Sequence, residues 1–259
     1  MTTPPNPAKV VVEHSTSAAV ADPIKSAPDY ATLQDAADVH GLDIYGGFHP
    51  THSQLTNIPG ADSPDSSSRT GTYGTMILLG ATASFWPNFT NSREYMDGAA
   101  HPIDRWSNRI IERMAQAWGA CPAYPFTEPP FMPFVAWALA TGRSFTSPSQ
   151  MLVHDRYGMM ISYRGALYFA HHIDLPPPPM AEAPCLSCID QPCLSTCPAE
   201  ALSHGGPYNL AACHSHLDSG SGTPCLSGGC LARRACPLSA GASRTPAQSA
   251  HHMRYFHTK

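Results

Sequence analysis

The residues of this chain best suited to carry chemistry are eight cysteines that lie between positions 185 and 236. The first four form the pattern Cys185-x2-Cys188-x4-Cys193-x3-Cys197, and Pro198 follows them directly. The other four are Cys213, Cys225, Cys230 and Cys236, and Pro237 follows the last of them. Runs of this type hold cubane iron–sulfur clusters, because a short loop with several thiolates can wrap around one cluster and direct its amides at the sulfides. Eight thiolates are enough for two clusters with four ligands each.

The positions of the prolines indicate how the eight thiolates divide. In two-cluster ferredoxins, the cysteine before a proline ligates the other cluster, because the proline turns the chain away. Carried over by position, one cluster is bound by Cys185, Cys188, Cys193 and Cys236. The second cluster is bound by Cys197, Cys213, Cys225 and Cys230. The predicted cofactors are therefore two 4Fe-4S clusters.

Other uses of the cysteines fit the sequence less well. Two structural zinc sites also need four-cysteine sets, but only Cys185 and Cys188 have the two-residue spacing of a zinc knuckle. Four disulfides would suit a secreted scaffold, whereas we expect no secretory leader and a core large enough to fold without staples. The ninth cysteine, Cys121, stands next to Pro122 and is expected to be a small buried hydrophobe without a role in the clusters.

Composition limits the partners and the compartment. The 259 residues carry a formal net charge of −4, and 42% of them are hydrophobic but only 13% are charged. No basic stripe is present, so we expect no nucleic-acid partner. The apolar runs are of core length, so we expect no membrane span. A cluster protein of this kind suits a reducing cytoplasm.

The helices and strands that must position the cysteines are predicted from the spacing of apolar residues and from the glycines and prolines that end such segments. Residues 1–28 are proline-rich without a sustained period and are expected to form a disordered tail. A body is predicted over 29–179 and a dicluster module over 180–259. Within the body we expect, in order, a helix at 29–40, a strand at 42–48, a polar loop at 51–71 and a strand at 72–81.

In the second half of the body, the spacing of apolar residues predicts first helices and then strands. The clearest helix is predicted at 102–118, where apolar residues recur every three or four positions between Pro102 and Gly119. Further helices are predicted at 133–141 and from Ser147-Pro148 onward, then strands over 158–171 and a stiff spacer at 176–179. A helix at 246–259 is expected to pack on the module. The fold class predicted is α+β with an attached iron–sulfur module.

Several tracts resemble known families. The tract from His154 to Gly158, the strand from Tyr163 to Leu167, and Ile173-Asp174-Leu175-Pro176 with the cysteine run resemble epoxyqueuosine reductase, a corrinoid enzyme with two 4Fe-4S clusters. The cluster region is also similar to that of corrinoid reductive dehalogenases. Upstream, Phe48-His49-Pro50, the strand Met76 to Leu79 and the helix start Pro102-Ile103-Asp104 are similar to the cytosolic cobalamin-processing (decyanase/dealkylase) family.

These resemblances imply a nitroreductase-like α/β sandwich with a cobalamin pocket beside the clusters. They single out Arg164 and Tyr157 as residues near the corrinoid, although each also suits a structural role. We expect no transfer RNA substrate, because no tract resembles the helical repeats with which epoxyqueuosine reductase engages it, and the cobalamin-processing proteins have no clusters. The histidines near the module are expected to be solvated surface residues.

Two functions stay open at this stage. One is a corrinoid-dependent or corrinoid-processing oxidoreductase that receives electrons from a redox partner protein. The other is a stand-alone dicluster ferredoxin or redox subunit without a corrinoid, favoured by the lack of a clear catalytic acid, base or nucleophile.

Overall fold

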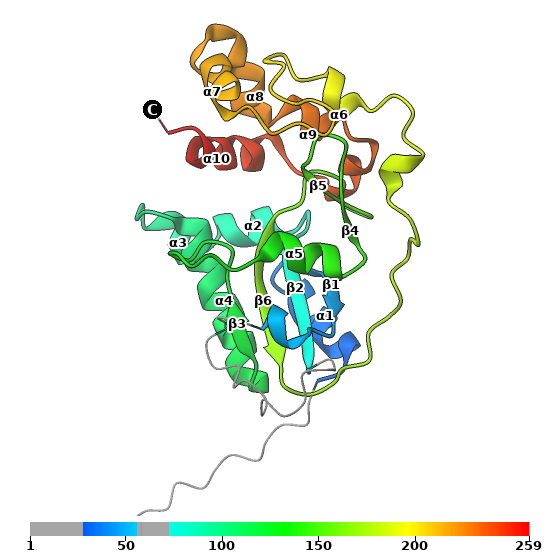
Figure 1. Cartoon of the computed structure of the whole chain (residues 1–259). Helices are drawn as coiled ribbons and strands as arrows, with labels where there is room; N and C mark the ends of the chain where they lie inside the picture. Colours follow the sequence, from blue (N-terminus) through cyan, green and yellow to red (C-terminus); the bar gives the residue numbers. More distant parts are fainter. Residues whose placement is uncertain (1–27, 56–57, 59–72, 259) are drawn as a thin grey trace, which may run out of the picture.

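The computed structural model describes residues 28–55, 58 and 73–258. The chain folds into a mixed α/β body followed by a helical module, which lies above the body in Figure 1. A long segment without regular structure runs along one side of the molecule from the last body strand to the module. The predicted tail and most of the predicted loop at 51–71 lie outside the described residues.

The centre of the body is a four-stranded antiparallel sheet. Its order is β1 (Leu42–Phe48), β2 (Thr75–Ala81), β6 (Tyr163–Phe169) and β3 (Cys121–Ala123). Every residue of β2 is buried, as its apolar run predicted for a strand covered on both faces.

Helices cover both faces of this sheet. On one face, α1 (Tyr30–Asp38) and α4 (Pro102–Trp118) pack against Ile77 and Leu79 of β2. On the other face, α5 (Phe134–Ala140) packs against Met76 and Leu78. Because neighbouring residues of a strand point to opposite faces, one apolar run serves both cores. The helices and strands predicted in this part of the body are confirmed, and α4 has the predicted bounds.

Two short helices, α2 (Phe85–Thr90) and α3 (Arg93–Met96), precede α4, and an ion pair joins α3 to the middle of α4. Glu94 is buried and accepts hydrogen bonds from Arg109 at 2.6 and 2.8 Å. Hydrogen bonds from Arg109 hold the pKa of Glu94 at about 2, with a further contribution from Arg93 that opposes the effect of burial. The pair therefore joins α3 to α4 in its charged form.

Glu94→Gln is expected to lower the free energy of unfolding at pH 7 by about 1–3 kcal/mol, because it leaves the partly buried Arg109 without its charge partner. Because the pKa of Glu94 is lowered in the folded state, this stabilisation is present above about pH 4.5 and is lost as the pH falls toward 2. Urea unfolding followed by tryptophan fluorescence measures it. Asp97→Asn in the exposed Arg105–Asp97 pair is the control and should change little. Equal losses in both variants would contradict the prediction.

A second, two-stranded sheet carries the body toward the module. It consists of β4 (Ser144–Thr146) and β5 (Leu152–His154). The helix predicted from Ser147-Pro148 is wrong, because these residues form the turn of this hairpin, in which the Ser147 amide donates to the Met151 carbonyl at 2.9 Å.

The strand region predicted over 158–171 is only partly correct, since β6 begins at Tyr163. Before it, Gly158 forms a bridge with His154 of β5, whereas Met159 bonds with the module. The amide of Met159 donates to Ser239 Oγ, and its carbonyl accepts from Arg233 at 2.6 Å. The backbone here is satisfied across the boundary between the two parts.

The module is built from short helices. They are α6 (Pro192–Ser195), α7 (Leu210–Asp218), α8 (Thr223–Gly228), α9 (Leu231–Ala235) and α10 (Pro246–Phe256), with 3-10 turns at Pro184–Leu186, Gly220–Gly222 and Pro237–Ala242. The predicted C-terminal helix is confirmed as α10, whose Met253 packs with Leu217 and Cys225. Within the described residues, no helix is both long and apolar enough to cross a membrane.

Candidate metal centres and the adjoining cavity

The first set of predicted ligands comes together where the hairpin meets the module. Burial raises the pKa of the Cys185 thiol to about 11. Three neighbouring thiols add to that rise, those of Cys236, Cys193 and Cys188. Cys185 lies in the first 3-10 turn, Cys193 in α6, and Cys236 directly after α9, and α6 packs on α9. Val153 of β5 and Met159 cover this set with apolar surface.

The second set comes together beneath α7 and α8. Burial raises the pKa of Cys213 and of Cys225, and the neighbouring thiols of Cys230 and Cys197 raise both further. Cys213 is in α7, Cys225 is in α8, and Cys230 directly precedes α9. The two groups in which the thiols neighbour one another are the two sets predicted from the sequence.

One short helix joins the two sets. Cys230 precedes α9 and Cys236 follows it, and a five-residue helix is only about 8 Å long. Cys193 and Cys197 also belong to different sets although they are separated by three residues. The chain therefore crosses between the two sites twice, which holds them close together.

In each site, a hydroxyl group donates a hydrogen bond to one of the sulfur atoms. Tyr208 Oη donates to Cys213 Sγ at 3.0 Å in the second set. At Cys193 in the first set, burial raises the pKa and a hydrogen bond from Ser149 lowers it. Hydrogen bonds to ligand sulfurs are among the factors that set the reduction potential of a cluster.

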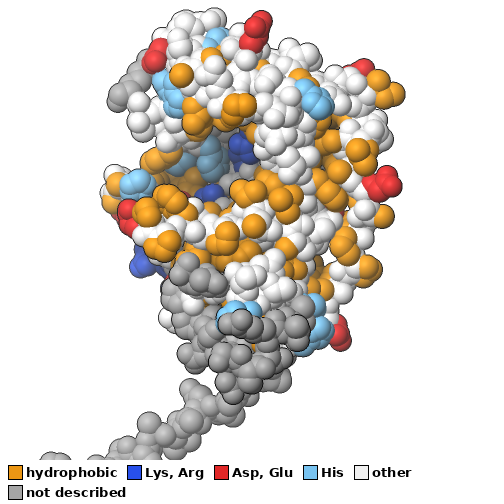
Figure 2. All heavy atoms as spheres, viewed as in Figure 1, with side chains coloured by type: hydrophobic (Ala, Val, Ile, Leu, Met, Phe, Trp, Pro, Cys, Tyr) orange, Lys and Arg blue, Asp and Glu red, His pale blue; other side chains and the backbone are white. Residues whose placement is uncertain are grey.

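A cavity of ≈ 460 Å³ lies between the second set and the body. All four cysteines of this set line it, together with apolar side chains of the body such as Leu152, Met159 and Ile161. Arg233 and two histidines, His216 and His252, also line it. In Figure 2 the surface is hollowed between module and body, and basic and histidine side chains are visible in the hollow. A cluster held by these four cysteines would fill part of this space, and the part next to the body could receive another molecule.

Within residues 28–55, 58 and 73–258, no three or more His, Cys, Asp or Glu side chains form a group that could hold a metal ion. In a cubane each thiolate binds a different iron, so cluster ligands stand further apart than the ligands of one ion. The eight module cysteines are not disulfide-bonded. Burial of neighbouring thiols disfavours several thiolates in one place, and a bound metal centre would offset that cost.

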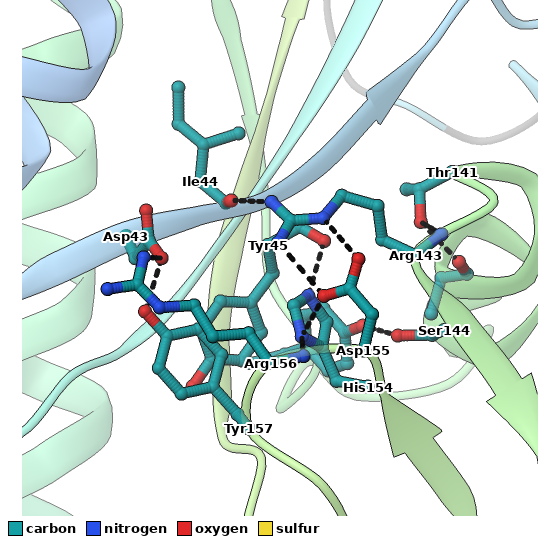
Figure 3. Close-up of polar contacts among 12 residues, drawn as sticks. Asp43, Ile44, Tyr45, Thr141, Arg143, Ser144, His154, Asp155, Arg156 and Tyr157 are labelled. Atoms are coloured by element: carbon teal, nitrogen blue, oxygen red, sulfur yellow. Dashed lines mark hydrogen bonds and ion pairs between the residues drawn. The ribbon is translucent and has the colours of Figure 1, made fainter. Parts of the chain in front are cut away.

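Tyr157 is held in a polar network inside the body (Figure 3). Its hydroxyl donates a short hydrogen bond to Asp43, and its ring stacks on Tyr45 with centroids 4.8 Å apart. Burial and the bond to Asp43 raise the pKa of Tyr157 well above its ordinary value. The side chain is therefore fixed by structural contacts, at the edge of a cavity that Asp43 and Arg156 also line.

The neighbouring Asp155 anchors the hairpin to this network (Figure 3). Arg143 donates to both of its carboxylate oxygens at 2.9 Å. Burial would raise the pKa of Asp155, but hydrogen bonds from His154 and Arg143 lower it to about 2. The network keeps its charges paired.

Arg164 is not brought together with Tyr157. It lines a different cavity of ≈ 260 Å³ with Asp104 and His252, whereas Tyr157 faces the cavity near Asp43. The nearest carboxylate to Arg164 is Asp104 at 3.9 Å. Because His252 lines both this cavity and the one beside the second cysteine set, the two spaces adjoin.

The histidines of the module region were predicted to be solvated, and for two of them this is wrong. His251 and His257 are buried, because α10 packs with its histidine-bearing side against the body and against α7. The half-buried basic residues Arg233, Arg244 and His252 were missed. Only the fold brings them together, since Arg233 follows a cluster ligand and His252 belongs to an ordinary histidine pair.

No protein-family model matches the chain, and a search of the curated proteins found no match.

Proposed function

We propose that this chain is an electron-transfer protein that carries two 4Fe-4S clusters in a ferredoxin-like module attached to a nitroreductase-like body. The observation that carries the proposal is the grouping of eight thiols into two sets of four, the second of which borders the cavity between module and body. The clusters, when bound, would supply one-electron chemistry.

The chain's residues arrange the two sites in series. Around the first set, Leu186 and Ile189 are 76% and 95% exposed, so this end of the module is open to a redox partner. The second set faces the cavity, which is mostly apolar. This arrangement supports entry of electrons from a partner protein at the first set and their delivery to an acceptor in the cavity.

A corrinoid is the acceptor that the family resemblance suggests. The cavity fits it in chemistry, because Leu152, Met159 and Ile161 offer apolar surface to a macrocycle and Arg164 offers hydrogen-bond donors to its polar groups. A whole cobalamin is larger than the cavity of ≈ 460 Å³, so part of it would lie in the open hollow of Figure 2.

That difference in size also favours a second candidate function. A dicluster ferredoxin or redox subunit would use the same two cysteine sets and pass electrons to another protein without a corrinoid. Tyr157 supports this alternative, because its hydroxyl is committed to Asp43.

Anaerobic reconstitution tests the proposal. We expect a brown protein with about eight irons and eight sulfides per chain. Saturable binding of cob(II)alamin, followed by its visible and EPR spectra, would support the corrinoid function. No binding at tens of micromolar, with the clusters present, would favour the ferredoxin. A colourless protein that binds two zinc ions would overturn both.

A further inference from the structure

Arginine side chains line the two adjoining cavities between module and body, Arg233 in the cavity of the second cysteine set and Arg164 in the neighbouring one. Arg233 donates to the carbonyls of Met159 and Ile161 at 2.6 and 3.0 Å. Arg164 comes from β6 of the body, and Arg244 comes from the segment before α10. Arg244 is their electrostatic neighbour, since burial and then the charges of Arg233 and Arg164 lower its pKa.

We call the group of Arg164, Arg233, Arg244 and His252 the basic pocket, and the positive charge of its three arginines is not balanced by protein carboxylates. Among the residues that the structure describes, Asp104 is the one carboxylate within 4 Å of any of the three guanidinium groups, at 3.9 Å from Arg164. Burial lowers the pKa of Arg244 to about 9, and the charges of Arg233 and Arg164 oppose its protonation as well. Buried cations without partners are costly, so such a group is expected to have a counter-ion.

Unused donors point to where that counter-ion lies. Arg164 Nε and His252 Nε2 are both buried and have no hydrogen-bond partner in the structure. Both side chains line the ≈ 260 Å³ cavity, and His252 and Arg233 line the adjoining cavity of the second cysteine set. A buried donor without a partner costs about 1–3 kcal/mol, which a bound acceptor would remove.

The thiolates of the second cluster site do not account for the whole group. The thiol of Cys230 acts on Arg233, so a cluster there would balance part of its charge. Burial lowers the pKa of Arg164, and the charge that opposes this effect is that of Asp104 and not that of a cysteine in the second set. Arg164 and its unpaired Nε therefore need an acceptor of their own.

We infer that the basic pocket binds an oxyanion, a carboxylate or phosphate group, carried by the molecule that accepts electrons from the second cluster. The assignment of that molecule as the electron acceptor rests on the proposed function, whereas the anion site itself rests on the arginines. Guanidinium groups suit oxyanions because they donate several hydrogen bonds in a fixed plane. The acceptor is thus expected to be an anionic molecule with an apolar part that fills the neighbouring cavity.

Calorimetric titration of the cluster-loaded protein with inorganic phosphate and, separately, with acetate tests this inference. We expect saturable binding of at least one of them, and the stronger of the two indicates the acceptor's group. Arg164→Gln and Arg244→Gln should each weaken binding by roughly 10-fold or more, because each removes a charge-assisted hydrogen bond. Arg234→Gln is the matched control, because Arg234 adjoins Arg233 in α9 but is exposed and outside the cavities. It should change binding by less than about twofold.

Iron and sulfide content, measured on the same samples, separates the two proposals. Full iron content without saturable binding of either anion would overturn the anion site and leave the electron-transfer function intact. If the protein takes up no clusters but binds an anion in a way that depends on Arg164 and Arg244, the electron-transfer function would be overturned and the anion site would stand. Equal weakening by Arg164→Gln, Arg244→Gln and Arg234→Gln would also overturn the anion site, since it would mean a diffuse effect of charge.

Discussion

Replacing Cys197 with alanine is expected to remove about half of the iron and sulfide from the reconstituted protein. Cys197 belongs to the second set, so the site that borders the cavity should lose its cluster while the first site keeps its four ligands. The reduced protein should then show the EPR signal of one cluster without the spin coupling of two. Delivery of electrons to an acceptor in the cavity should fall to background.

Two further variants are the controls for Cys197→Ala. Cys121→Ala should keep the full iron content, because Cys121 lies in β3 of the body and in neither set. Cys236→Ala should also lose about half of the iron, but from the first site, so its remaining cluster should have the spectrum that Cys197→Ala lacks. Full iron in Cys197→Ala, or the same remaining spectrum in both cysteine variants, would contradict the division into sets.

Much of this arrangement was predictable because the signals are local. The bounds of α4 follow from Pro102, the apolar spacing and Gly119, all within one stretch of chain. The cysteine sets follow from spacing and from the prolines after Cys197 and Cys236, because the turn that each proline imposes is a local property.

The features that escaped prediction depend on contacts between distant segments. Met159 reads as a strand residue, yet its carbonyl binds Arg233, which is 74 positions away. Ser147-Pro148 is a sequence typical of the first residues of a helix, but the pairing of β4 with β5 makes it a turn. The basic pocket unites Arg164, Arg233 and Arg244, and no periodicity in the sequence links them. Spacing describes one segment at a time, so it does not predict which buried charges will meet.

The contact between body and module at Gly158 should be the place where a single added methyl group lowers the stability of the fold most. Gly158 has a φ of +57°, and a Cβ at this position would lie 2.3 Å from the backbone nitrogen of Ser239 in the module. Gly158→Ala therefore combines left-handed strain with a clash against backbone that cannot rotate away. We expect the free energy of unfolding to fall by about 3 kcal/mol and the Tm to fall by roughly 6–12 °C.

Gly98→Ala separates the two causes, because Gly98 also has a positive φ, +69°, but nothing within 4 Å of the added Cβ. It should cost only about 1 kcal/mol of conformational strain. Tryptophan fluorescence reports on the body, which holds all four tryptophans, and cluster absorbance reports on the module. If this contact couples the two parts, Gly158→Ala should lose cluster absorbance at a lower temperature than tryptophan fluorescence changes, whereas Gly98→Ala should keep the two transitions together. A Tm for Gly158→Ala no lower than that of Gly98→Ala would contradict this prediction. It would mean that the module does not contact the body closely at Gly158, and that the volume of the cavity between them is larger in solution than ≈ 460 Å³.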